Sequence, residues 1–158
     1  MVSAHHSVLS IQYSSLGRFF IRGGAMGRIA PLVMVVDDDL DFLEICRHVL
    51  ESGGYRVACC TDADVALKQM ASEKPDLVIS DLMMKSLDAG FLFVKEVRDD
   101  ARFRTLPAII ISGVGSQRGY DFAPRTAEDL AAMRVDAFLT KPITPDKLLA
   151  KVRELVGS

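Results

Sequence analysis

Nearly continuous apolar runs alternate with segments of helical spacing from residue 32 to the end of the chain. Residues 32–36, 77–80 and 108–111 form such runs, the pattern of strands that are buried on both faces. Residues 55–60 and 137–139 are two further runs of the same kind. The sequence therefore predicts five short strands, each followed by a segment of different periodicity.

The segments between the strands predict helices, because apolar residues recur in them at intervals of three and four. The predicted inward faces are Phe42, Ile45, Cys46, Val49 and Leu50 in the first helix, Val65, Ala66, Leu67 and Met70 in the second, Phe91, Val94 and Val97 in a third over residues 90–100, and Leu148, Leu149, Val152, Leu155 and Val156 in the last. Gly53 and Gly54 are expected to end the first helix. Thr61 is expected to cap the second, with Asp64 as its partner acid.

Two later helices carry N-terminal capping signals. Thr126 and Asp129 form a capping-box pattern for a short helix that runs to Met133. Thr144 precedes Pro145, which suits the first position of a helix. These signals complete five strand–helix units.

Strict alternation of strands and helices predicts an α/β fold, a doubly wound five-stranded parallel sheet with helices on both faces. Right-handed crossovers leave few other arrangements of such units. In sheets of this class the functional site lies beyond the carboxyl ends of the strands. The candidate chemistry is therefore sought among the residues that follow each strand.

The first 30 residues lack this alternation and contain several serines and a Gly23–Gly24 step. We expect two regions, a loosely ordered N-terminal extension over residues 1–30 and a folded domain over residues 31–158. Translation that starts at Met26 would account for such an extension. The alternative is an arm that packs on the domain or on a partner through Phe19, Phe20 and Ile21.

Composition narrows the possible function classes. The chain is 49% hydrophobic and 25% charged with a net charge of −2, which fits a folded domain and gives no indication of nucleic-acid binding. No apolar run approaches the ~20 residues of a membrane helix. Cys46, Cys59 and Cys60 lack the spacing of metal ligands and are expected to be small core residues in a reducing, cytoplasmic compartment.

Polar side chains gather at the predicted strand ends. Asp37, Asp38 and Asp39 follow the first strand, Asp81 the third, Ser112 the fourth and Lys141 the fifth. Each residue alone could be a helix cap or a solvated charge, but several carboxylates at one sheet edge repel each other unless a cation is present. Oxygen ligands of this kind suit Mg²⁺.

Phosphoryl transfer to a carboxylate is the chemistry that fits this set. Asp81 would be the nucleophile. Mg²⁺ held by Asp37 or Asp38, by Asp81 and by the backbone carbonyl of Met83 would offset the charge of the transferred group. Lys141 would contact one phosphoryl oxygen and the Ser112 hydroxyl another.

Four motifs in order along the chain resemble the signatures of response-regulator receiver domains. They are residues 35–39 (VVDDD), 76–84 (DLVISDLMM), 109–113 (IIISG) and 138–142 (FLTKP). The resemblance covers residues 32–156 and implies the flavodoxin-like receiver fold. It also implies a role in two-component phosphorelay signalling.

The resemblance assigns roles residue by residue. Asp37 and Asp38 match the acidic metal-binding pair, and Asp81 matches the phosphorylated aspartate. Ser112 matches the switch hydroxyl and Phe138 the switch aromatic. Lys141 matches the family's lysine, whose peptide bond to the following proline is typically cis.

Two departures from the family pattern lie in the loop after Asp81. Lys85 stands where the family commonly has proline, and residues 87–90 (LDAG) replace a shorter Asp-Gly turn. They leave the geometry of this loop open. Residues 113–125 form a connection several residues longer than usual, which we expect to be a recognition surface; alternatively, its Tyr120 and Phe122 cover the sheet edge.

The expected function is that of a stand-alone receiver and not of an enzyme acting on external substrates. It would accept phosphate from a histidine kinase or phosphotransfer protein. Only residues 142–158 follow Lys141, too few for an output domain, so we expect it to signal by contact with a downstream protein. We expect a monomer or weak homodimer. One alternative is a receiver-like binding module that works without phosphorylation. Another is a phosphatase with an aspartate nucleophile, which needs a second acid at the position of Met83.

Overall fold

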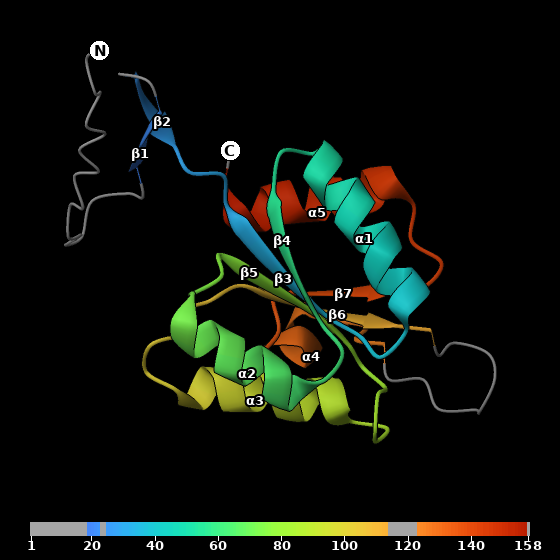
Figure 1. The fold of residues 1–158 in the computed structure, drawn as a ribbon. Helices are drawn as coiled ribbons and strands as arrows, with labels where there is room; N and C mark the ends of the chain where they lie inside the picture. Colours follow the sequence, from blue (N-terminus) through green and yellow to red (C-terminus); the bar gives the residue numbers. More distant parts are fainter. Residues whose placement is uncertain (1–18, 23–24, 114–122, 158) are drawn as a thin grey trace, which may run out of the picture.

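The computed structural model describes residues 19–22, 25–113 and 123–157. A parallel sheet of five strands forms the centre of this part of the chain, in the order β4-β3-β5-β6-β7 (Figure 1). Its strands are β3 (Leu32–Val36), β4 (Arg56–Cys60), β5 (Leu77–Asp81), β6 (Ala108–Ser112) and β7 (Ala137–Thr140). The predicted five-stranded, doubly wound α/β sheet is confirmed.

Helices cover both faces of the sheet (Figure 1). They are α1 (Leu40–Ser52), α2 (Ala63–Ser72), α3 (Ala89–Asp99), α4 (Ala127–Ala132) and α5 (Pro145–Val156). α1 and α5 pack on one face, and α2, α3 and α4 on the other. The sheet thus separates two hydrophobic cores, and every residue of β3, β5 and β6 is buried between them, as their apolar runs predict.

Most positions predicted to face inward in α1 and α2 are buried or half-buried, and one position in each helix was predicted wrongly. Ile45 and Val65, predicted to face inward, are 58% and 44% exposed. In α1 the buried stripe is Leu43, Cys46 and Leu50. Apolar residues lie along two adjacent lines on each helix, and packing against the sheet decides which line is buried.

One helix cap also differs from the prediction by one residue. Asp62, and not Thr61, caps α2, because its side chain accepts a hydrogen bond from the Val65 N–H. In α3 the fully buried phenylalanine is Phe93, while Phe91 is only half-buried. The Thr126–Asp129 capping box and the Thr144 cap before Pro145 are confirmed.

Two aspartates set the register at the opposite edge of the sheet from the predicted site. Asp76 accepts a hydrogen bond from the Leu32 N–H at 2.7 Å, and its own N–H donates to the Leu32 carbonyl. Asp136 makes the same pair of bonds with Ala108, at 2.8 and 2.9 Å. Because each aspartate directly precedes its strand, each pair aligns the start of that strand with its neighbour.

Arg98 holds the second of these aspartates in place. Its buried guanidinium donates to Asp136 at 2.7 Å and to the carbonyls of Arg134, Arg104 and Leu106. Because its N–H groups donate to these four acceptors, the buried guanidinium ties the end of α3 to the start of β7. This anchor lies where β7 begins, five residues before Lys141.

The three cysteines are free thiols, with Cys46 and Cys60 buried and Cys59 half-buried, as expected of core residues. Burial raises the pKa of Cys46 to about 12 and that of Cys60 to about 11, so both remain protonated. No helix in residues 25–113 and 123–157 is long and apolar enough to cross a membrane. Residues 114–122 of the predicted recognition loop lie outside the described part of the chain.

An antiparallel hairpin of β1 (Phe19–Arg22) and β2 (Ala25–Arg28) precedes the sheet. The sequence pattern does not predict this hairpin. In Figure 1 it lies beyond the start of β3 and joins neither edge of the five-stranded sheet. We propose that residues 1–30 form an extension separate from the domain of residues 31–158.

Removal of residues 1–25 tests this division. A chain that begins at Met26 loses β1 but keeps every strand of the central sheet, so its melting temperature should stay within about 5 °C of the full chain. A chain that begins at Met34 cuts into β3 and should lose its cooperative transition. Thermal unfolding followed by circular dichroism measures both. A fall of more than about 10 °C for the first chain would show that the extension stabilises the domain.

Candidate functional site

Three carboxylates meet at the carboxyl edge of the sheet. Asp37 follows β3, and Asp81 is the last residue of β5, the neighbouring parallel strand. One oxygen each from Asp37, Asp38 and Asp81 lies within 4.8 Å of the others. Asp37 and Asp81 are buried, at 1% and 7% exposure, while Asp38 faces solvent. The predicted convergence of these side chains is therefore present.

The start of α1 fixes the first two acids. Asp39 is the N-cap, and its side chain accepts hydrogen bonds from the N–H groups of Asp41 and Phe42. The Asp37 side chain in turn accepts from the Asp39 N–H at 2.8 Å. The acid of the triplet that caps the helix is thus Asp39, which leaves the Asp37 and Asp38 carboxylates to face the site.

The Asp81 carboxylate is held from its own loop. One oxygen accepts a hydrogen bond from the Met83 N–H at 3.1 Å. Gly90, in the first turn of α3, donates its N–H to the Leu82 carbonyl. A Cβ at Gly90 would collide with the Asp81 carbonyl oxygen, so only glycine lets α3 begin this close to the end of β5.

Lys141 joins the two buried acids. Its ammonium lies 2.8 Å from an Asp37 oxygen and 3.2 Å from an Asp81 oxygen. The backbone holds it there, because the Lys141 N–H donates to the Ser112 carbonyl. The Lys141–Pro142 peptide bond is cis, as expected. One cation and two buried anions therefore share the centre of the site.

The site raises the pKa of both Asp81 and Lys141, which favours the neutral form of the acid and the charged form of the base. Desolvation, and next the charge of Asp37, raise the pKa of Asp81 to about 6, although Lys141 opposes the shift. Burial alone would lower the pKa of Lys141, but its hydrogen bond to Asp37 and the charges of Asp81 and Asp37 outweigh burial and raise that pKa. A further cation in the site would relieve the repulsion between the acids.

Ser112 and Phe138 lie on adjacent strands beside the acids. Ser112 is the last residue of β6 and is 3% exposed. Phe138 pairs with Ile110 and packs, half-buried, against the core under α2, α3 and α4. Ser112 thus stands at the edge of the sheet beside the site, and Phe138 lies two residues before the position on β7 that pairs with it.

Phe42 is a neighbour of the site that the sequence analysis assigned only to the core. The Lys141 ammonium lies over its ring, 3.9 Å from the centroid. Helical periodicity marks Phe42 as inward-facing, but no sequence pattern indicates which cation meets the ring. This contact links the first turn of α1 to the loop after β7.

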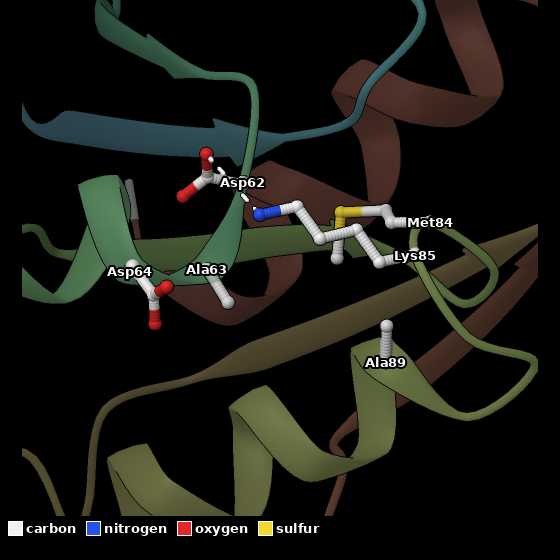
Figure 2. A pocket seen from close by; sticks show the side chains of 6 residues that line it. All are labelled: Asp62, Ala63, Asp64, Met84, Lys85 and Ala89. Atoms are coloured by element: carbon white, nitrogen blue, oxygen red, sulfur yellow. Dashed lines mark ion pairs between the residues drawn. The ribbon is translucent and has the colours of Figure 1, made fainter.

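A pocket beside the site contains the departure at Lys85. It lies between the start of α2 and the loop from β5 to α3, and its lining residues are Asp62, Ala63, Asp64, Met84, Lys85 and Ala89. Figure 2 shows Lys85 reaching toward Asp62, with 3.8 Å between their charged atoms. This exposed ion pair connects the loop to α2, a contact that proline could not make, and it adds little to stability because solvent screens the two charges.

The donor set at the edge fits a hard divalent cation. Carboxylate oxygens that lie this close, two of them buried, are the ligands that Mg²⁺ prefers. The exposed Asp38 leaves one side open to water, which Mg²⁺ usually retains as ligands. Histidine or cysteine, which would favour a transition metal, is absent from this cluster.

Comparison with known proteins gives a consistent result. The family model of the response regulator receiver domain matches residues 33–153. The chain is 35% identical over 128 residues to response regulator Rre1 of Synechocystis sp., covering 79% of this chain and 51% of that protein. It is 32% identical over 122 residues to an uncharacterized 14.6 kDa protein of Leptolyngbya boryana, covering 77% of this chain and 87% of the relative.

Solved structures agree with the fold. Chemotaxis protein CheY4 of Vibrio cholerae superposes with a TM-score of 0.69 at 25% identity, over 80% of this chain and 99% of that chain. The chain spans about half the length of Rre1 and similar shares of two other curated regulators, 44% and 48%. The similarity to these longer relatives is therefore a similarity to one domain of them.

The buried charge of Asp81 leads to a prediction about stability. Folding raises the pKa of Asp81 to about 6, so the folded chain holds this proton more tightly than the unfolded chain does. The resulting stability is fully present below the unfolded pKa and is lost as pH rises through about 6. In the absence of divalent cations, Asp81→Asn should therefore be more stable than the natural chain at pH 8, by at most about 3 kcal/mol. The difference should vanish near pH 4.

Urea unfolding at pH 4, 6 and 8 measures this difference, with the exposed Asp41→Asn as a matched control. The control should differ little from the natural chain across the series. If Asp81→Asn were no more stable than the natural chain at pH 8, the repulsion inferred at the site would be refuted.

Proposed function

The chain belongs to the response regulator receiver domain family, and we propose that it is a phosphoacceptor that takes up a phosphoryl group on Asp81. Receiver domains are signalling domains of two-component systems and not turnover enzymes on external substrates. The observation that carries the proposal is the shared ammonium, with Lys141 within 3.2 Å of Asp81 and 2.8 Å of Asp37. A nucleophile, a second acid and a cation thus lie together at the carboxyl edge of the sheet.

The proposed reaction is an in-line displacement. An Asp81 carboxylate oxygen attacks the phosphorus of a phosphohistidine on a histidine kinase or phosphotransfer protein. The new O–P bond forms as the P–N bond breaks, and the imidazole leaves with the bonding electron pair and takes up a proton. Asp81 must be ionised, and with its pKa at about 6 it is mostly so at neutral pH.

Mg²⁺ is the cofactor that the donor set suits, held by Asp37, Asp38, Asp81 and the Met83 backbone carbonyl. Bound there, it would offset the negative charge that the phosphoryl group brings to three carboxylates. Lys141 would move from Asp37 toward a phosphoryl oxygen, since Asp37 then faces the cation. Ser112 would donate its hydroxyl to another phosphoryl oxygen.

The donor protein would meet the exposed start of α1. Leu40 and Ile45 are 67% and 58% exposed and lie on the helix that begins directly after the acids. Exposed apolar side chains next to a reactive group are typical of a contact surface. A helix that docks there would bring its phosphohistidine to Asp81.

Ser112 and Phe138 form the proposed switch. A phosphoryl group adds roughly −1.5 to −2 charges and acceptor oxygens, which would draw the Ser112 hydroxyl toward it. Movement of Ser112 would free space toward Phe138, which is only half-buried and has no hydroxyl that would lose a partner inside. The changed surface would be read by a downstream protein, with the domain as a monomer or weak homodimer in the cytoplasm.

A phosphatase with an aspartate nucleophile is the weaker alternative. Such an enzyme needs a proton donor two residues after the nucleophile, and that residue here is Met83. A thioether cannot donate a proton. The phosphoryl group would therefore stay on Asp81 until water or a second protein removes it.

Intact mass with a small phosphodonor such as phosphoramidate tests the proposal. The natural chain should gain one phosphoryl group with Mg²⁺ and almost none in excess chelator, because the cation offsets the charge of the transferred group. Asp81→Asn should gain none, while the matched control Asp41→Asn should be labelled like the natural chain. Undiminished labelling of Asp81→Asn, or full-rate labelling in chelator, would refute the assignment.

A further inference from the structure

We propose that Phe42 is a positioning residue of the phosphoryl-transfer site, whose ring holds the Lys141 ammonium in place by a cation–π contact. This inference rests on the proposed phosphoacceptor function and adds to it a residue that no receiver motif in the chain marks. Phe42 would act through Lys141 and would not touch the phosphoryl group itself.

The ammonium of Lys141 has three neighbours in the part of the chain that the structure describes. Two are the carboxylates of Asp37 and Asp81, at 2.8 and 3.2 Å. The third is the face of the Phe42 ring, with its centroid at 3.9 Å. An ammonium within about 6 Å of an aromatic face is attracted by the negative charge density of the ring.

The ring is itself held firmly. Phe42 lies in the first turn of α1, where its N–H donates to the capping carboxylate of Asp39. Its side chain is half-buried against the core beneath α1 and α5. The helix cap that follows the acidic pair therefore also sets the position of the ring, and one short segment places both the carboxylates and the ring around Lys141.

The contact of Lys141 with the ring should outlast its ion pair with Asp37 when Mg²⁺ and a phosphoryl group enter the site. Mg²⁺ at Asp37 would compete with Lys141 for the same oxygen, so that ion pair weakens. An uncharged ring binds no Mg²⁺ in water, so its contact with the ammonium persists. Lysine has a long, flexible stem, and the remaining ring contact would keep its ammonium directed toward the phosphoryl oxygens on Asp81.

Core packing is the alternative role for Phe42, and ring fluorination separates the two. Replacement of Phe42 by mono-, di- and trifluorophenylalanine withdraws charge from the ring face with little change of shape. If the ring holds the ammonium, the rate of Asp81 phosphorylation at saturating Mg²⁺ should fall stepwise with each fluorine, by roughly 2- to 30-fold in total. The melting temperature should stay nearly constant through the series.

Phe91 provides the matched control, because it is also a half-buried phenylalanine on a helix, packed against the opposite core. The same fluorination there should leave the phosphorylation rate unchanged. Phe42→Leu keeps an apolar side chain without a ring and should be at least as slow as the trifluoro protein. A flat rate across the Phe42 series would overturn the positioning role and leave packing as the explanation.

Proton NMR of the unphosphorylated chain reads the contact directly. Ring current from Phe42 should shift the Lys141 ε-methylene protons upfield, and Phe42→Leu should abolish the shift. Absence of this shift in the natural chain would overturn the contact, whatever the phosphorylation rates. If the natural chain took no phosphate on Asp81, the proposed function would fail, and the role of Phe42 with it. If the chain were phosphorylated but its rate did not change with fluorination of Phe42, only the role of Phe42 would be refuted.

Discussion

A lysine ammonium that joins two buried carboxylates is the interaction on which the site depends. Asp37 and Asp81 are almost inaccessible to water, and buried charges are costly unless they are paired. Lys141 alone does not balance them, since desolvation and Asp37 still raise the pKa of Asp81 to about 6. The domain keeps an electrostatic strain that a divalent cation would relieve. Asp81 nevertheless stays mostly ionised at neutral pH, the form that can act as a nucleophile.

The fold holds this arrangement from both ends of its strands. Asp76 and Asp136 pair with neighbouring backbone groups where β5 and β7 begin, and Asp81 and Lys141 each stand five residues later along the chain. Parallel strands that start in register deliver their last residues to the same edge. Gly90 completes the geometry by letting α3 approach the end of β5. Substitutions at the far edge can therefore disturb the site without touching it.

The sequence predicted the strands and their terminal residues well, because a strand buried on both faces leaves a continuous apolar run that ends abruptly at a polar residue, as at Val36–Asp37. Helix orientation was predicted less well. Ile45 and Val65 lie beside the buried stripes of their helices, and only packing decides which stripe faces the sheet. The contact of Phe42 with Lys141 joins residues far apart in the chain, and no periodicity encodes such a pair. The hairpin of β1 and β2 lies within residues 1–30, where the alternation of apolar runs and helical spacing is missing.

A crystal structure with Mg²⁺ and beryllium fluoride, an analogue of the phosphoryl group, would show directly whether Asp81 is the phosphoacceptor. We expect the fluoride adduct on an Asp81 oxygen, with the Lys141 ammonium and the Ser112 hydroxyl within hydrogen-bonding distance of its fluorines. Mg²⁺ should be bound by carboxylates of the Asp37–Asp38 pair, by Asp81 and by the Met83 carbonyl. An adduct on another residue, or a Lys141 that remains on Asp37 while Asp81 carries the group, would contradict this expectation.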